Sequence, residues 1–280
     1  MNNIDRRHFL GTSAVGAAAF LAGNSLAADG KRPKLGVQLY SVRDIAAKDL
    51  PGVLKSIAKM GYEGVEFAGY YGHSAEDLKL MLDDNGLVAA GAHVGIDTLT
   101  GDRFIESLKF HRKIGNRFPI VPGLPGNYTN TPDAWKSTAD LFNAIAATLK
   151  QFGMRTGYHN HTHEFHAFDN GEVPWDIFFG NTVDDVIMQF DTGNAMHADA
   201  GALPFLEKYP GRAASIHCKE FSTTNDKALL GEGEVPWKDL FAIADEQDAT
   251  EWYIVEQESY AYPPMECIEK CLANIRALLA

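Results

Sequence analysis

Short apolar runs alternate with helical patterns along most of the chain. Apolar side chains at every second position predict strands, and apolar residues three and four apart predict helices. The predicted strands cover residues 34–41, 62–67, 87–91, 118–122, 155–159, 186–191, 213–219 and 252–256. Helical patterns lie between and after them, among others at residues 132–152, 202–209, 237–246 and 264–279. The pattern therefore predicts eight strand–helix units.

The ends of the helical patterns carry local signals. Asp49 and Ser74 stand at N-cap positions, and Pro51 follows in the first turn after Asp49. Strict alternation of strand and helix is typical of parallel strands joined by right-handed crossovers. No Gly-x-Gly-x-x-Gly segment follows the first strand, which disfavours an open dinucleotide-binding sheet. We therefore predict an α/β fold, a single (β/α)₈ TIM barrel over residues 34–280.

The first residues have a different pattern. Arg6 and Arg7 precede a run of small and apolar residues at 11–23, and residues 25–27 (Ser-Leu-Ala) fit a cleavage site. The arginine pair resembles a twin-arginine export signal. A membrane anchor is the alternative, but the run is short and rich in Gly and Ala. We expect residues 1–27 to be a signal peptide, and the mature protein to be periplasmic with no stable membrane association.

Composition and charge exclude several classes of protein. The chain has 280 residues, of which 45% are hydrophobic and 22% charged, which excludes a disordered or collagen-like protein. The formal net charge of −12 disfavours nucleic acid as a partner, because phosphate binding needs a basic surface. The three cysteines, Cys218, Cys267 and Cys271, do not make a disulfide framework and are expected to be packing residues.

Acidic residues and histidines gather where the predicted strands end. In a barrel of this kind the carboxyl ends of the strands form the active site. A single polar strand end is usually a surface or capping group, but six of the eight strands end in this way. These ends carry Glu66, His93, His159, His161, Glu164, Asp191, His197, His217, Lys219, Glu256 and Glu258.

Carboxylates that meet at one barrel mouth resist burial unless a cation neutralises them. A mixture of Asp, Glu and His suits a divalent metal such as Mn²⁺, Zn²⁺, Co²⁺ or Mg²⁺. A solvated polar rim without an ion is the alternative. The number and placement of these residues favour the metal.

Six segments in order resemble the xylose-isomerase-like barrel superfamily, which includes sugar phosphate isomerases and epimerases, inosose dehydratases and apurinic endonucleases. They are GYEGVEF at 61–67, GYHNHTHEF at 157–165, QFDTGNAMHAD at 189–199, SIHCKEF at 215–221, GEGEVPW at 231–237 and IVEQE at 254–258. The resemblance implies one metal, held by Glu, Asp, His and Glu from strands five to eight. Asp191, His217 and Glu256 match three of these positions.

The strand-five position departs from the family pattern. His159 stands where many relatives have a glutamate, so either His159 or His161 replaces the carboxylate, or Glu164 reaches back to the metal. We expect Glu164 to be the fourth ligand, and Glu164 and Glu256 to be the catalytic carboxylates. Contacts to substrate are expected from Glu66, His93, His159, His161, His197 and Lys219.

A metal bound to a ketone acidifies the neighbouring C–H and stabilises the enediolate that forms when a base removes the proton. We therefore expect a metal-dependent isomerase or epimerase that acts on a keto-sugar, glycoside or cyclitol. A lyase or hydratase acting across a 3-keto-glycoside or inosose is the first alternative. A non-catalytic, exported sugar-binding barrel is an alternative of another class.

Two features bear on the substrate. The sequence lacks a phosphate-binding Gly-rich loop with a Lys, and the GEGEVPW segment is acidic, so a neutral carbohydrate is expected rather than a sugar phosphate. The oligomeric state stays open, a homo-oligomer included.

Overall fold

In the computed structural model, which describes residues 32–280, eight parallel strands close into a barrel in chain order. The first strand pairs with both the second and the eighth. The strands are β1 (Lys34–Gln38), β2 (Gly64–Phe67), β3 (Val88–His93), β4 (Pro119–Val121), β5 (Gly157–His159), β6 (Ile187–Asp191), β7 (Ser215–Cys218) and β8 (Trp252–Val255). The predicted (β/α)₈ barrel is confirmed. The predicted signal peptide lies outside the described residues and stays a prediction.

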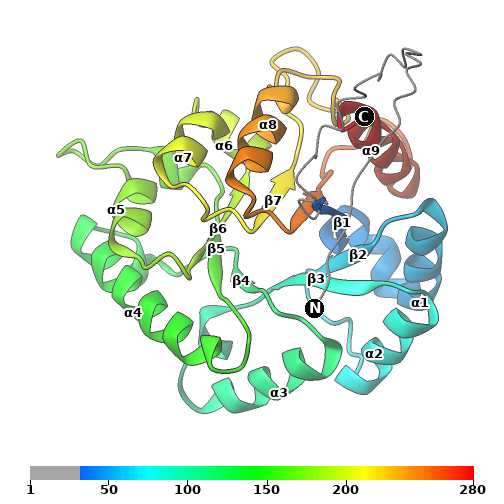
Figure 1. The fold of residues 1–280 in the computed structure, drawn as a ribbon, viewed down its shortest axis with the longest axis horizontal. Coiled ribbons are helices and arrows are strands. Elements are labelled where there is room, and N and C mark those ends of the chain that lie inside the picture. The colour runs from blue at the N-terminus through cyan, green and yellow to red at the C-terminus, as the bar shows by residue number, and fades with distance from the viewer. Residues whose placement is uncertain (1–31) are drawn as a thin grey trace, which may run out of the picture. The chain divides into compact units, whose positions relative to one another are not determined.

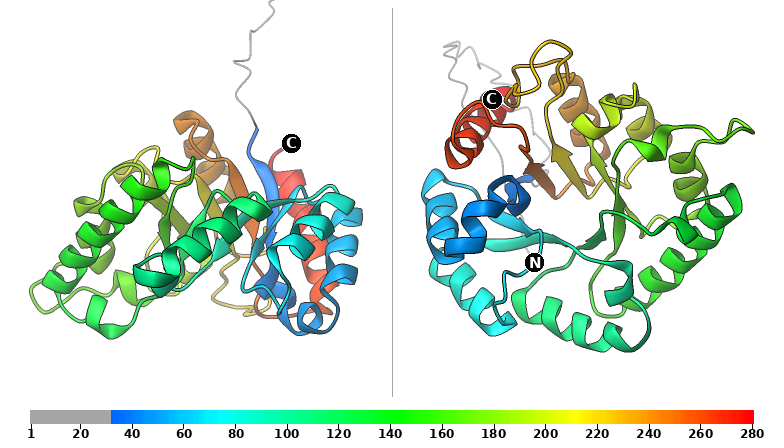
Figure 2. Two further views of the ribbon diagram at one scale, coloured as in Figure 1. Left: turned by 90° about the horizontal axis from the view of Figure 1, so that it is seen from below. Right: turned by 180° about the vertical axis from the view of Figure 1, so that it is seen from behind.

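The helices form a ring outside the strands (Figures 1 and 2). They are α1 (Arg43–Met60), α2 (Ala75–Asp84), α3 (Phe104–Ile114), α4 (Pro132–Lys150), α5 (Pro174–Asn181), α6 (Thr192–Met196), α7 (Ala202–Lys208), α8 (Trp237–Gln247) and α9 (Pro264–Leu278). Single 3₁₀ turns lie in the loops at Leu39–Val42, Ile96–Thr98, Gly101–Arg103, Gly126–Tyr128 and His163–Phe165. Within residues 32–280 none of the helices has the length and apolar character needed to cross a bilayer.

The local signals in the sequence act as predicted. The Ser74 hydroxyl accepts a hydrogen bond from the Asp77 amide at 3.1 Å and caps α2. Asp49 interrupts α1 with φ −151° and ψ 71°, and its carboxylate accepts a hydrogen bond from the Gly52 amide at 2.9 Å. The helix ends at Gly61, whose φ of 98° is the left-handed conformation that glycine adopts at little cost.

Several strands are shorter than the apolar pattern predicts. The first ends at Gln38 rather than at residue 41, because Leu39–Val42 turns into a 3₁₀ helix. The Gln38 side chain caps this turn by accepting a hydrogen bond from the Tyr40 amide at 3.1 Å. The seventh ends at Cys218 rather than at residue 219.

Side chains inside the barrel are stacked in levels along its axis. The lower part of the interior is apolar and is filled by Ala90, Phe118, Ile120, Ile187, Ala214, Trp252 and Ile254. Trp252 fits because its neighbour on β2 is Gly64, where an added Cβ would lie 2.7 Å from the indole Cη2. Side chains two apart on a strand share a face, so the residues above this floor also point inward. They are polar, and they lie toward the carboxyl ends of the strands.

A second core lies between the barrel and the helices. It contains outward-facing strand residues such as Tyr158 and Ile216, packed against helical residues such as Trp135. Cys218, Cys267 and Cys271 are buried there as free thiols, as the strand and helix patterns predicted.

Buried Glu220 holds together the long loop between β7 and α8. Its carboxylate accepts hydrogen bonds from the Gly231 amide at 2.6 Å, the Trp237 indole at 2.8 Å and the Val235 amide at 3.2 Å. These three donors belong to the GEGEVPW segment, whose acidic side chains were expected to repel phosphate. The structure gives the segment a different role, because its backbone wraps around a buried carboxylate.

We expect Glu220→Gln to lower the free energy of unfolding by about 1–3 kcal/mol, because an amide group would face donors that need an acceptor. Thermal unfolding measures this change. Glu246→Gln, at an exposed position on α8, removes the same charge and should leave the melting temperature unchanged. Equal melting temperatures for the two variants would contradict the role given to Glu220.

Candidate metal centre

Four buried side chains meet at the carboxyl end of the barrel. His159 ends β5, Asp191 ends β6, His217 lies near the end of β7, and Glu256 follows β8. One potential ligand atom from each lies within 4.8 Å of those of the other three. Two imidazoles and two carboxylates are a donor set that suits Zn²⁺ and other divalent transition metals.

Two atoms of this group lack partners. The Asp191 Oδ2 and His159 Nδ1 atoms are buried and have no hydrogen-bond partner among the described residues. The Asp191 Oδ2 atom lies 3.9 Å from the His217 Nδ1 atom and 4.0 Å from the His159 Nε2 atom. Buried polar atoms without partners are costly, and a divalent cation would satisfy a carboxylate and a neutral imidazole together. The residues present therefore fit a metal.

The charge states agree with this fit. Burial raises the pKa of Asp191 to about 7, although nearby Lys219 acts in the opposite direction. Burial and the neighbouring His217 lower the pKa of His159 well below its ordinary value. The His159 ring is therefore neutral, with one nitrogen lone pair free to bind a cation.

Hydrogen bonds around Asp191 orient its carboxylate so that the Oδ2 atom faces the centre. The Asp191 Oδ1 atom accepts a hydrogen bond from the Asn194 amide at 2.7 Å, which caps α6. The Asn160 side chain accepts from the Asp191 amide at 2.8 Å and donates to the Asp191 carbonyl at 3.0 Å. With Oδ1 engaged, Oδ2 is the carboxylate oxygen that faces the centre.

His217 lies between two carboxylates. Its Nδ1 atom is 2.7 Å from the Glu256 Oε2 atom, and its Nε2 atom is 2.5 Å from the Glu66 Oε2 atom. Burial alone would lower the pKa of His217, but Glu66 and Glu256 outweigh it and raise the pKa to about 10. A histidine that binds metal with one nitrogen commonly donates the other N–H to a carboxylate, and Glu66 is placed to accept it.

Glu66, on β2, is fully buried and contacts His217 of the four-residue group. Its carboxylate accepts hydrogen bonds from the side chains of Gln38 and Gln189, both at 2.8 Å. Glycine at position 91 leaves room for it, because an added Cβ would lie 2.3 Å from the Glu66 Oε1 atom. In the structure Glu66 contacts these side chains and His217, and its expected contact to substrate stays a prediction.

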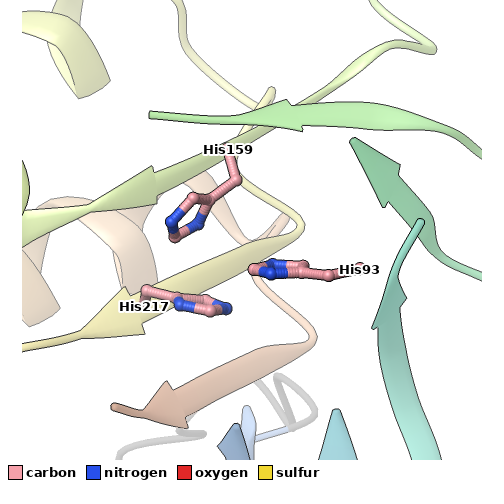
Figure 3. A group of neighbouring side chains, drawn as sticks. All are labelled: His93, His159 and His217. Carbon is pink, nitrogen blue, oxygen red and sulfur yellow. The ribbon is translucent and has the colours of Figure 1, made fainter. Parts of the chain in front are cut away.

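His93, at the end of β3, faces the same space as His159 and His217 (Figure 3). Its ring is stacked on that of His217, with centroids 5.2 Å apart, and lies 4.7 Å from the ring of His159. The three histidines form a second potential donor group that overlaps the first. The His93 Nε2 atom also contacts the Gln189 Oε1 atom at 2.8 Å, which ties His93 to the level below.

Glu164 is not brought to the centre, although the sequence favoured it as the fourth ligand. Its carboxylate accepts hydrogen bonds from the Tyr158 hydroxyl at 2.7 Å and from the His161 amide at 2.9 Å. Alternation on β5 explains this placement: His159 points into the barrel, so Tyr158 points toward the helices and Glu164 meets it there. His159 takes the strand-five position in the group.

The remaining candidates lie at the rim. The ammonium group of Lys219 donates a hydrogen bond to the Asn194 side chain at 2.9 Å and pairs with the Glu258 carboxylate. Burial alone would lower the pKa of Lys219, but Asp191, Glu256 and Glu258 raise it, so the side chain stays charged. His161 is exposed, with its ring 5.3 Å from that of His159. His197 is also exposed, against Phe221.

Sequence reasoning gave no role to several residues that support the centre. They are Gln38, Asn160, Gln189, Asn194 and Ser215, and Gln189 also donates a hydrogen bond to the Ser215 hydroxyl at 2.9 Å. A usable signal was present for two of them. Gln189 and Ser215 lie two residues before Asp191 and His217, so strand alternation places each pair on one face.

We expect the purified protein to bind about one divalent transition metal per chain, and Asp191→Ala, His217→Ala and His159→Ala each to lose it. Glu164→Gln should keep the metal, because its contacts lie on the helix side of β5. Elemental analysis after dialysis checks this, with thermal unfolding to verify that each variant is folded. Metal loss in Glu164→Gln together with retention in His159→Ala would reverse the assignment.

Glu66→Gln tests the orienting contact to His217. Removing this carboxylate should weaken metal binding by about 10–100-fold. Competition with a chromogenic chelator measures the affinity. Glu63→Gln, a partly exposed neighbour on the same segment, serves as the matched control and should bind metal like the parent protein. Unchanged affinity in Glu66→Gln would remove Glu66 from the centre.

Known proteins resemble this chain in sequence and in fold. An inosose dehydratase from Clostridium perfringens is 24% identical over 243 residues, which cover 73% of this chain and 81% of that protein. A solved structure described as a sugar phosphate isomerase/epimerase from Parabacteroides distasonis is 26% identical, with a TM-score of 0.75 and coverage of 89% of this chain and 96% of that one.

The solved IolI protein, described with a bound zinc atom, shares the fold with a TM-score of 0.67 at 15% identity, covering 88% of this chain and 98% of its own. A family model for the xylose isomerase-like TIM barrel matches residues 54–278. The chain belongs to the xylose isomerase-like TIM barrel family.

Proposed function

We propose that this protein is a metal-dependent carbohydrate enzyme that removes a proton next to a ketone and then eliminates a neighbouring oxygen substituent. The observation that carries the proposal is the unpartnered, buried Asp191 Oδ2 atom, which lies near His217 and His159 in a four-residue donor group. Support for elimination comes from curated relatives described as inosose dehydratases at 24–26% identity. The expected substrate is a small keto-sugar, glycoside or cyclitol.

The metal would be held by His159, Asp191, His217 and Glu256. A divalent ion bound there polarises a carbonyl and lowers the pKa of the adjacent C–H. Glu256 is assigned the role of proton acceptor because, of the four donor residues, it is the one that lines the adjoining cavity. Burial alone would raise the pKa of Glu256, but His217 and Lys219 lower it well below its ordinary value, so the carboxylate is ionised.

Lys219 is suited to electrostatic stabilisation. An ammonium group that stays charged gives up its proton reluctantly, but it stabilises negative charge that develops on a substrate oxygen. Asn194 and Glu258 hold it in place, so little reorganisation is needed during the reaction. The buried position of the four donors keeps bulk water away from the reacting group.

Epimerisation is the second candidate, favoured by the Parabacteroides structure described as an isomerase/epimerase. It differs in what happens after the proton leaves. In elimination the C–O bond on the neighbouring carbon breaks, and the oxygen substituent takes up a proton and leaves as water or an alcohol, whereas epimerisation returns a proton to the opposite face. The two outcomes therefore give different products from one shared first step.

We expect the metal-loaded protein to convert 2-keto-myo-inositol or 3-keto-glucosides in D₂O with loss of water or of the aglycone and with appearance of an enone absorption. Nuclear magnetic resonance and mass spectrometry follow the reaction. Deuterium uptake at carbon without loss of water or of the aglycone would instead identify an epimerase. Glu256→Gln should lower the rate by about 100-fold or more if this carboxylate is the base.

Metal content is measured alongside, because Glu256 also belongs to the donor group. Binding of these sugars without elimination or deuterium uptake in the metal-loaded protein would contradict an enzyme and support a non-catalytic sugar-binding barrel.

A further inference from the structure

A cavity of about 210 Å³ lies beside the metal centre, between the ends of β6, β7 and β8. Of the four donor residues only Glu256 lines it, so the cavity is offset from the centre and adjoins it at one carboxylate. A substrate whose carbonyl reaches the centre at Glu256 would place the rest of its structure here. The lining that carries the following argument is Asn194, His197, Lys219, Phe221, Asp226 and Glu258.

The size of the cavity suits one six-membered ring. An engineered protein cavity of about 150 Å³ holds a benzene ring, so about 210 Å³ leaves room for a ring with hydroxyl groups. The Asn194 side chain bonds Lys219 through its oxygen and the Asn160 carbonyl through its nitrogen, and each of these atoms has capacity for one further hydrogen bond to a ring hydroxyl. Phe221, edge-to-face with His197 at a centroid separation of 4.8 Å, offers an aromatic surface to the C–H face of a sugar.

The charges of the lining are unsuited to an anion. The lining contains four acidic residues, Glu220, Asp226, Glu256 and Glu258, and one ammonium group, that of Lys219, which pairs with Glu258. A phosphate group placed here would face more negative charge than the single ammonium group of Lys219 offsets, and such like-charge contacts disfavour a phosphorylated ligand. The acidic GEGEVPW segment does not line the cavity, so carboxylates outside this segment would exclude a phosphate group.

We propose that this cavity is a subsite for an uncharged, polyhydroxylated six-membered ring, and that Asp226 and Glu258 exclude phosphorylated sugars from it. The inference rests on the proposed function, because it places the reacting carbonyl at Glu256. Asp226 is the more informative residue to change, since it is exposed and Glu258 also positions Lys219.

Binding of matched neutral and phosphorylated rings tests the proposal. The probes are myo-inositol with myo-inositol 1-phosphate, and glucose with glucose 6-phosphate, titrated calorimetrically into the metal-loaded protein. We expect each phosphate ester to bind about tenfold more weakly than its neutral partner, or worse. Asp226→Lys should reduce this ratio by about tenfold, and Asp226→Asn by a smaller factor.

Asp140→Lys makes the same charge change at an exposed position on α4, and it should leave the ratio as in the parent protein. Phosphate esters that bind as tightly as the neutral rings, rings that do not bind at all, or a ratio insensitive to Asp226→Lys would each overturn the proposal.

Turnover is recorded separately, so that the two proposals fail in different ways. The predicted selectivity without any conversion of keto-sugars would contradict the proposed function and leave the subsite standing. Conversion of keto-sugars without selectivity for neutral over phosphorylated rings would support the proposed function and contradict the subsite.

Discussion

Three carboxylates share the interior of one closed barrel, and the arrangement of the site depends on how their negative charge is balanced. Glu66 and Glu256 lie on either side of His217, and their negative charges raise the pKa of its imidazole. Asp191 has one oxygen bonded to the backbone and one without a partner. Buried carboxylates are tolerated only when paired or hydrogen-bonded, so the neighbouring polar side chains follow from this need.

Inside the barrel, the side chains that support the site lie below the side chains that could bind a metal. Apolar side chains at the floor fix the spacing of the strands, and the amides of Gln38 and Gln189 above them fix the carboxylate of Glu66. Glu66 in turn orients His217. A potential metal ligand is therefore positioned by side chains on the strands, which are more rigid than loops.

Hydrophobic periodicity was sufficient to predict the barrel, because eight strand–helix repeats leave few ways to bury both faces of the strands. It also placed Asp191, His217 and Glu256 at one mouth. The choice of His159 over Glu164 depends on the side of β5 toward which each side chain points. Strand alternation predicts this direction within residues 155–159, but it does not predict the direction for Glu164, which lies beyond the end of the strand. The role of Gln38 was not predictable either, since it depends on contacts between strands that the chain separates widely.

The apolar side chains around Trp252 determine from which end of the barrel a small molecule can enter. Gly36 and Gly64 let the indole lie across the barrel axis, so the interior is filled at the amino end of the strands. Within residues 32–280, this packing leaves the carboxyl end as the entrance to the centre. Reactant and product must then use the same entrance in turn, and a product that lingers there competes directly with the next molecule to arrive.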